Sequence, residues 1–515
     1  MSSRKVLFLI LLTVGAFCLH GYHPWAEDAA IYLPVVEKLL NPHLFAFNPQ
    51  FFESHASLTL YPQLIANSVR FSHLPLAYAL LLWQGISIFL LLYACWELAE
   101  RCYPREISCY AGVALVAALL TLPVAGTALY IMDQYLNPRN LTAFVGVLAV
   151  VKLLDRKYVA TVALLMFAMV IHPLMGAFAV CFCGLLFWIE RSQIPQAAVA
   201  GVLPLGLLDR PTPAYHPIAL AHAYFYPLRW EWYEWLGVIG PLLLLWWFVR
   251  IARSRQMRNL EVISRALIIY QIIFVIGALV ISIPQRFETL ARLQPMRSLF
   301  LLYILFVLFA GGLIGEYFLK NRWWRWMALF GPLCVGMFYA QLALFPSSAH
   351  IEWPGSRQRN PWEQAFQWAR NHTPADAVFA LDPDYMHIPG EDENSFRALA
   401  ERSMLADAVK DSGAASMFPP MAEEWLRQVQ AQSGWRTFGM QDFRRLQGEY
   451  GVNWVVLQQP EGPELECPFQ NRAVKVCKLP AESLEYASHQ ILSPHDSGGD
   501  LRRSAEVRSF HQLSR

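Results

Sequence analysis

Two adjacent carboxylates, Glu27 and Asp28, follow the first apolar stretch and immediately precede a second apolar run, 29–40. Neighbouring acids at a membrane boundary are costly unless they have partners or a chemical role. Such a carboxylate can act as a general base toward a hydroxyl group. The alternative is structural, because acids at this position also cap a helix and complement its dipole. The apolar spacing predicts that 29–40 is an amphipathic helix on the membrane surface.

Further candidate side chains lie in two segments between apolar stretches. Segment 132–140 contains Asp133, a second candidate acid, and Arg139, a candidate for phosphate binding. The alternative for this segment is a solvated turn. His172, which precedes a proline at another membrane turn, is also a candidate for substrate binding. The alternative for His172 is a satisfied interfacial side chain.

Three arginines, Arg286, Arg292 and Arg297, lie close together in one loop between apolar stretches. The guanidinium group is a rigid fork that suits phosphate or carboxylate. On the outer side of a membrane, such a cluster opposes the usual distribution of positive charge. It therefore suggests a site for a phosphate-bearing lipid. The alternative is that the arginines pair with Glu288 and other nearby acids.

Cys467 and Cys477 lie close in sequence in the C-terminal part of the chain. We place that part in an oxidising compartment, where we expect the two to form a disulfide. The other cysteines lie in or beside apolar stretches and are read as small buried hydrophobic residues. The chain has no P-loop, no G-x-G-x-x-G, no H-E-x-x-H and no G-x-S-x-G. A divalent metal ion could assist catalysis, but the sequence does not define a site for one.

Membrane helices must position most of these residues. The chain is 56% hydrophobic and 16% charged, whereas soluble proteins have about 25% charged residues. A net charge of +2 gives no field that would attract nucleic acid, so no nucleic-acid partner is expected. A spanning helix needs about 20 apolar residues. The sequence predicts eleven spans, at 6–20, 75–98, 107–131, 141–154, 158–172, 174–190, 195–208, 233–251, 262–283, 298–317 and 326–346.

The distribution of basic residues predicts the orientation. Arg4 and Lys5 place the N-terminus in the cytoplasm, and with eleven spans every later basic cluster falls on the same side. Residues 1–346 then form a multi-spanning domain of the inner (plasma) membrane with a long outer loop, 21–74. The remainder of the chain lies in the periplasm or its equivalent.

The C-terminal part alternates between helical and strand patterns, which predicts a small α/β domain over 347–484. Its predicted helices are 361–370, 421–432 and 440–449, and its predicted strands are 377–382, 451–457 and 474–476. Residues 485–515 are polar and are expected to be disordered. This domain could bind an acceptor or a partner, or could simply cap the membrane part.

The stretch Glu27-Asp28-Ala29-Ala30-Ile31-Tyr32 resembles the outer loop of the C-type glycosyltransferases (GT-C superfamily). These are multi-spanning enzymes that take a sugar from a polyprenyl-phosphate carrier. Asp133 resembles their second outer acid, and an outer soluble domain is similar to that of many members. The chain looks closest to a bacterial branch of the superfamily. It has no W-W-D-Y-type acceptor signature, which argues against an oligosaccharyltransferase.

The resemblance implies a mechanism. Asp28 or Glu27 would act as general base on an acceptor hydroxyl, which displaces polyprenyl phosphate from the sugar. Arginines would stabilise the leaving phosphate. The acceptor would be an envelope glycan, a lipid or a protein. Two other functions remain open: a transporter or flippase for a lipid-linked or anionic solute, and a non-catalytic scaffold. A transporter should bury charges at mid-membrane, whereas here nearly all charge lies at the boundaries.

Overall fold

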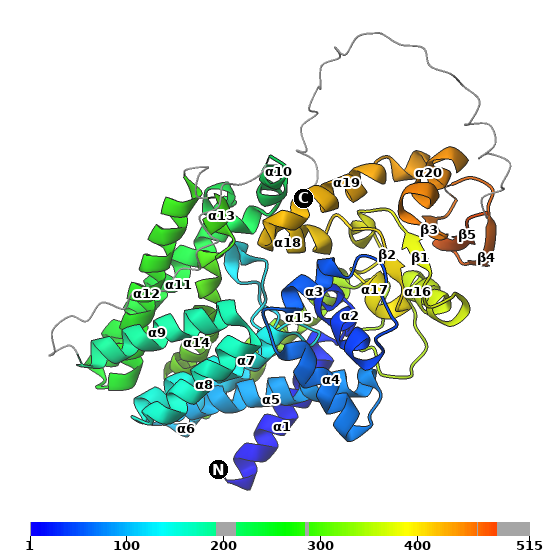
Figure 1. Cartoon of the computed structure of the whole chain (residues 1–515). Helices are drawn as coiled ribbons and strands as arrows, with labels where there is room; N and C mark the ends of the chain where they lie inside the picture. The colour runs from blue at the N-terminus through cyan, green and yellow to red at the C-terminus, as the bar shows by residue number, and fades with distance from the viewer. Residues whose placement is uncertain (1, 192–212, 284–287, 461, 481–515) are drawn as a thin grey trace, which may run out of the picture.

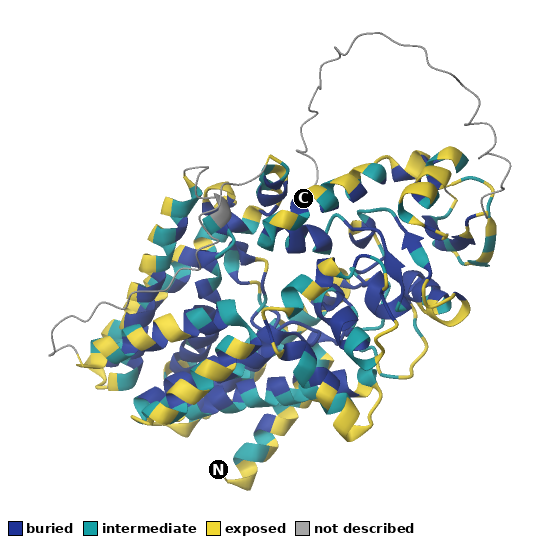
Figure 2. Ribbon diagram, viewed as in Figure 1, coloured by how far each residue is buried: buried dark blue, intermediate teal, exposed yellow. Residues whose placement is uncertain are grey.

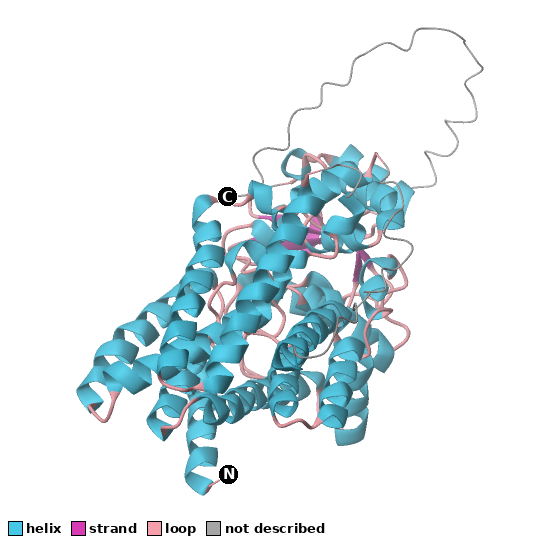
Figure 3. Ribbon diagram, turned by 90° about the vertical axis from the view of Figure 1, so that its left-hand side faces the viewer, coloured by secondary structure: helices cyan, strands magenta, loops and turns pink. Residues whose placement is uncertain are grey.

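The computed structural model describes residues 2–191, 213–283, 288–460 and 462–480. It is mostly helical, with a bundle of long helices and a C-terminal domain that contains a sheet (Figure 1). The strands are confined to one end of the molecule (Figure 3). The predicted span 195–208, the predicted disordered segment 485–515 and Arg286 lie outside the described residues.

Among the described residues, seven helices are long and apolar enough to cross a membrane, by length and composition. They are α1 Ser3–His20, α5 Leu76–Cys102, α9 Pro173–Arg191, α11 Trp232–Ser254, α12 Arg258–Ser282, the stretch Pro295–Leu319 with α14 Leu299–Ile314 at its centre, and α15 Trp323–Leu344. Large apolar side chains on their outward faces are exposed, as expected for surfaces that contact lipid (Figure 2). The protein is therefore a multi-pass membrane protein.

Three shorter helices within the described ranges also belong to the bundle: α6 Glu106–Ala118, α7 Pro138–Leu154 and α8 Tyr158–Ile171. The count of eleven spans is thus not confirmed. The predicted span 107–131 is wrong in its second half, because α6 ends at Ala118. Beyond it the chain folds back on itself, with a bridge between Pro123 and Tyr130. Pro123 has no amide hydrogen to donate and disfavours helical backbone in the residue before it.

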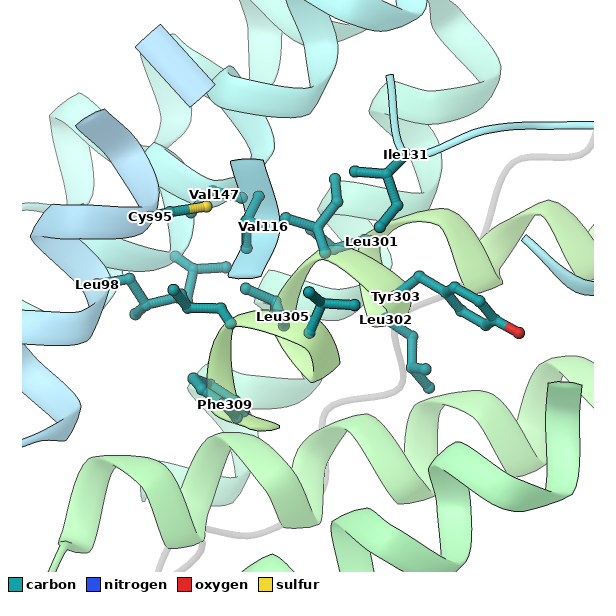
Figure 4. Packing of buried hydrophobic residues seen from close by; sticks show 14 of the residues in the cluster. Cys95, Leu98, Val116, Ile131, Val147, Leu301, Leu302, Tyr303, Leu305 and Phe309 are labelled. Atoms are coloured by element: carbon teal, nitrogen blue, oxygen red, sulfur yellow. The ribbon is translucent and has the colours of Figure 1, made fainter. Parts of the chain in front are cut away.

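The bundle is centred on α14, which packs closely on α6. Cβ atoms added at Gly112 of α6 and Gly311 of α14 would each lie 2.8 Å from a carbonyl oxygen of the other helix. Small residues therefore allow the two backbones to approach, as is common between membrane helices. Figure 4 shows Leu305 and Phe309 of α14 gathered with Val116 of α6 and other apolar side chains in this core.

Segment 21–74 forms three helices between the bundle and the C-terminal domain: α2 Ala29–Leu40, α3 Gln50–Ala56 and α4 Tyr61–Ser72. The helix predicted for 29–40 is present, and its place on the membrane surface stays a prediction. It packs against α4 and against Ala398 of the C-terminal domain, in a buried cluster that includes Leu33 and Val36. Its sequence is apolar on nearly every side, which favours burial over a surface position.

The C-terminal domain contains a five-stranded sheet in the order β2-β1-β3-β5-β4. Its strands are β1 Val378–Ala380, β2 Ser403–Met404, β3 Trp454–Gln458, β4 Glu466–Gln470 and β5 Val474–Lys478. The first three in sequence are parallel, and β5 pairs antiparallel with both β3 and β4. Successive residues Val455 and Val456 enter clusters on opposite faces of the sheet, as the alternation of a strand requires.

Helices cover both faces of this sheet and extend to the bundle. They are α16 Pro361–His372, α17 Phe396–Ala400, α18 Lys410–Met417, α19 Ala422–Ala431 and α20 Met440–Tyr450. Two short helices near the outer rim of the bundle are α10 Tyr215–Ala221 and α13 Glu288–Ala291. The Glu27 amide donates to the Glu393 carbonyl oxygen at 2.9 Å. Backbone contacts of this kind connect the α1–α2 loop to the C-terminal domain.

Candidate active site

A cavity of about 2260 Å³ lies between the bundle and the C-terminal domain. It brings together the described residues that the sequence singled out for chemistry, although they come from segments far apart in the chain. Those that line it are Glu27, Asp28, Asp133, Arg139, His172, Arg292 and Arg297. The loops after β1 and β2 also line the cavity. Ligand sites in α/β domains commonly form at this position, at the carboxyl ends of parallel strands.

Asp28 stands at the N-cap of α2, but its side chain makes no capping hydrogen bond. Its Oδ2 instead accepts from Arg139 Nη1 at 2.6 Å, and its Oδ1 lies 3.4 Å from Lys410 Nζ. Glu27 has a left-handed backbone, with φ of 56°. A left-handed backbone conformation costs free energy for a residue other than glycine, and residues in such conformations cluster at functional sites. These observations favour a chemical role for the acid pair over the capping alternative.

Arg139 joins this acid pair to Asp133. Asn137 caps α7 by accepting from the Asn140 amide at 3.2 Å, and this places Arg139 in the first turn. Arg139 Nη2 donates to Asp133 Oδ2 at 3.1 Å, and Asn137 donates to the same oxygen at 2.5 Å. Asp133 is only 4% exposed. Its carboxylate therefore positions Arg139, and the solvated-turn alternative does not describe this segment.

The C-terminal domain adds two residues that sequence reasoning missed, Lys410 and Glu393. Lys410 is the first residue of α18, and its ammonium forms an ion pair with Glu27. Glu393 lines the cavity beside Glu27. Both lie more than 350 residues from the acid pair in sequence. One local feature of the sequence marks the start of the helix that carries Lys410. Asp407 stands three residues before Lys410 and accepts a hydrogen bond from the Lys410 amide at 2.6 Å.

These charges shift one another's pKa values. Burial alone would raise the pKa of Asp28, but Arg139 and Lys410 outweigh it and hold that pKa below its usual range. Burial opposes the charge on Lys410, yet Glu27 and Asp28 hold the lysine pKa above its usual value. Burial and the neighbouring Glu27 raise the pKa of Glu393 to about 9. At neutral pH, Asp28 is ionised and Glu393 carries a proton.

Another wall of the cavity carries Arg297, which lies just before α14. Its guanidinium stacks over the Tyr224 ring at 5.0 Å. Within the part of the chain that the structure describes, its Nε is buried with no hydrogen-bond partner. A buried guanidinium with a free N–H group can bind an anionic ligand, to which it donates hydrogen bonds. By contrast, Arg292 donates to the Met417 carbonyl oxygen at 3.2 Å.

His172 lies between α8 and α9 and faces the same cavity. Burial, reinforced by Arg139 and Arg297, lowers its pKa to about 3. Its Nδ1 accepts from the Met175 amide at 3.5 Å, which leaves Nε2 as the donor. His172 is therefore a neutral hydrogen-bond donor at physiological pH.

The cavity has an apolar stretch of lining on the side of the bundle, which includes Met169, Ile171, Leu174, Ala177, Leu220 and Leu293. The C-terminal domain contributes polar residues, which include Asp382, Asp384, His387, Gln430, Ser433, Arg436 and Thr437, and apolar residues, which include Met417, Phe418, Trp425, Leu426 and Trp435. The cavity can therefore hold an apolar chain against the bundle, and the polar groups of the C-terminal domain can bind a hydrated group.

No group of three or more His, Cys, Asp or Glu side chains among the described residues is arranged to hold a metal ion. Away from the cavity, a disulfide joins Cys467 of β4 to Cys477 of β5.

Comparison with known proteins gives a short family match. Residues 360–430 match a family described as a domain of unknown function (DUF6798). This stretch contains both Glu393 and Lys410. No curated protein matches the chain.

Solved structures with a similar arrangement include two of the Archaeoglobus fulgidus oligosaccharyltransferase. The apo form has a TM-score of 0.43 and 11% identity, and covers 89% of this chain and 70% of its own. The form tethered to an acceptor peptide has a TM-score of 0.43 and 12% identity, and covers 89% and 69%. The arabinofuranosyltransferase AftD from Mycobacteria has a TM-score of 0.40 and 11% identity, and covers 94% of this chain and 40% of its own.

Proposed function

We propose that this protein is a membrane glycosyltransferase that moves a sugar from a polyprenyl-phosphate carrier to an extracytoplasmic acceptor. One observation carries the proposal: the ionised acid Asp28 and the unpartnered Nε of Arg297 line a single cavity with an apolar wall on its bundle side. Sugar transfer from a lipid carrier needs a proton acceptor, a site for the leaving phosphate, and room for an apolar chain.

The donor lies against the bundle in this proposal. Its polyprenyl chain packs on the apolar residues of that wall, and its phosphate faces Arg297, with His172 as a second donor. Preorganised donors aimed at a developing charge usually contribute most to catalysis. Arg292 stands beside them on the same wall. Arg286 belongs to the same sequence cluster.

The reaction is a displacement at the anomeric carbon. The acceptor oxygen forms the new bond, the bond between that carbon and the phosphate oxygen breaks, and its electron pair leaves on the phosphate. The hydroxyl proton passes to Asp28. Oδ2 of Asp28 is held by Arg139 at 2.6 Å, whereas Oδ1 is 3.4 Å from Lys410. Oδ1, which has the longer and weaker of the two contacts, is the proposed proton acceptor beside the Lys410 ammonium, and Glu27 is the neighbouring acid that orients the acceptor.

In this proposal the acceptor binds on the side of the cavity that the C-terminal domain forms, where polar side chains are available. Asp382 and Asp384, in the loop after β1, and Arg436 offer hydrogen bonds suited to a hydroxylated group. Division of the chain into a membrane domain at 1–346 and an extracytoplasmic domain at 347–484 belongs to this proposal.

The orientation has its own test. With the N-terminus in the cytoplasm, an alkaline phosphatase fusion at residue 347 should be active and a fusion near residue 254 inactive. The reverse result would place the cavity on the cytoplasmic side and overturn the proposal for an outer acceptor.

Activity is tested with purified full-length protein and a panel of polyprenyl-phosphate sugars, with release of polyprenyl phosphate as the readout. At least one donor should release its carrier lipid in the presence of envelope extract as acceptor. Translocation of these lipids across vesicles without release would favour a flippase. Neither release nor translocation across the whole panel would contradict both functions.

A further inference from the structure

Lys410 occupies the space between the two carboxylates of the α1–α2 loop. Its ammonium contacts Glu27 and lies 3.4 Å from Asp28 Oδ1. Its side chain is 14% exposed, so the charge is largely removed from water. Such a buried ammonium is stable only with good partners, and here the two acids supply them.

The C-terminal domain holds Lys410 in place through its backbone. Asp407 accepts from the amides of Val409 and Lys410 at 2.9 and 2.6 Å. Arg397 holds Asp411 in a bidentate pair at 2.8 and 2.7 Å, which fixes the start of α18. The lysine therefore reaches the acid pair from a rigid support.

The oxygens of this acid pair do not fit a divalent metal ion. Mg²⁺ requires an octahedral set of oxygen ligands at about 2.0–2.1 Å. Asp28 Oδ2 is already engaged by Arg139, and the ammonium of Lys410 lies against Glu27 and Oδ1 of Asp28. A metal at this point would have to displace a lysine that the fold holds in place, and it would also meet the positive charge of Arg139.

We propose that the Lys410 ammonium is the resident cation of this site, and that the acid pair works with this ammonium in place of a divalent metal. Lys410 keeps Glu27 and Asp28 ionised side by side and leaves them oriented toward the cavity. The catalytic part of this inference rests on the proposed glycosyltransferase function. It also gives the stretch 360–430 a role, because this stretch supplies the cation that completes the site.

Mn²⁺ alone is the first probe, because its binding can be followed by electron paramagnetic resonance without any sugar donor. Full-length wild-type protein and Lys410→Arg should bind no Mn²⁺ at the acid pair at millimolar concentration. Lys410→Ala removes the competing charge and should bind Mn²⁺ tighter by about tenfold or more. Adding Glu27→Gln to Lys410→Ala should abolish that gain.

Lys38→Ala is the matched control. Lys38 also pairs with a glutamate, Glu53, at 2.6 Å, but the pair lies outside the cavity. This variant should show no gain in Mn²⁺ binding and no change in activity. Two outcomes would overturn the inference: Mn²⁺ binding by wild type that Glu27→Gln abolishes, or failure of Lys410→Ala to gain binding while its thermal unfolding shows that it is folded.

Sugar transfer provides the second readout. Wild-type transfer should continue in EDTA, and Lys410→Arg should retain more activity than Lys410→Ala. Loss of transfer in EDTA with recovery on addition of Mg²⁺ would also contradict the inference. Failure to detect transfer under any condition would count against the proposed function alone, because the Mn²⁺ experiment does not depend on it.

Discussion

The two ends of α7 carry similar ion pairs in different surroundings. At its first turn Arg139 bridges Asp28 and Asp133, is nearly buried, and lines the cavity. At its far end Asp155 and Arg101 form a bidentate pair at 2.7 and 2.8 Å, with about a fifth of each side chain exposed. One pair connects α7 to α5 beside solvent, whereas the other holds charge in place inside a cavity. An ion pair at a helix end indicates function only when it faces a space that a substrate can fill.

A large loss of activity should follow the removal of Arg297, whose Nε has no hydrogen-bond partner among the described residues. Arg297→Met removes the proposed phosphate donor, so transfer activity should fall by about 10²–10³-fold, the usual cost of losing one preorganised donor. Arg297→Lys retains the charge without the fork and should recover part of the loss. Steady-state release of polyprenyl phosphate measures both variants. Full activity of Arg297→Met would remove this residue from the site.

Removal of the arginine from each of the two ion pairs, Arg139 of α7 and Arg101 of α5, should have different effects on stability. Arg139→Met leaves Asp28 and Asp133 without their buried partner and should cost about 3–5 kcal/mol. Arg101→Met breaks a partly exposed pair and should cost about 1 kcal/mol or less. Thermal unfolding in detergent compares them, and equal losses would show that burial does not distinguish the two ends.

The sequence singled out residues at one end of α7 that line one cavity, but it did not single out their partners from the C-terminal domain. Glu27, Asp28, Asp133 and Arg139 stand beside apolar stretches, and membrane boundaries bring such positions together. Lys410 and Glu393 could not be placed in this way, because only tertiary packing of the C-terminal domain brings them to the acid pair. The prediction that Asp133 is a catalytic acid remains untested, but its burial behind Arg139 favours a positioning role.

In the fold too, the elements that depend on local sequence were predicted, and those that depend on tertiary packing were not. Helices 361–372 and 440–450 and strands β1 and β3 lie close to their predicted ranges, because local periodicity determines them. The strand β2 has two residues and leaves almost no pattern. The helix α2 was assigned to the membrane surface because an apolar run at helical spacing does not show what covers it.

The disulfide offers a smaller effect, outside the cavity. Cys467 and Cys477 close a short loop, so Cys477→Ser should cost about 2–3 kcal/mol in the chain-entropy model and leave transfer per folded molecule unchanged. Thermal unfolding with and without reductant provides the test. Quantitative thiol labelling of both cysteines in native, unreduced protein would contradict the bridge.

The protonated acids Glu363 and Glu393 should make stability depend on pH. Burial raises the pKa of Glu363 and of Glu393 to about 9, and Glu352 and Glu27 respectively add to the shift. Groups with a raised pKa in the folded state stabilise it fully below their ordinary pKa, and this contribution is lost as the pH rises through the folded value. The melting temperature should therefore fall between about pH 5 and pH 9. Glu363→Gln and Glu393→Gln should each flatten that fall, and an unchanged profile in both would contradict the assigned protonation.

The most direct test applies the same substitution near each end of α7. Asp28→Asn keeps the shape of the side chain and removes the proposed base, so release of polyprenyl phosphate should fall by about 10²–10⁴-fold. Asp155→Asn changes the pair that faces solvent and should leave release unchanged, with both proteins inserted and folded. Full turnover by Asp28→Asn at saturating donor would contradict the claim that this acid accepts the proton of the acceptor hydroxyl.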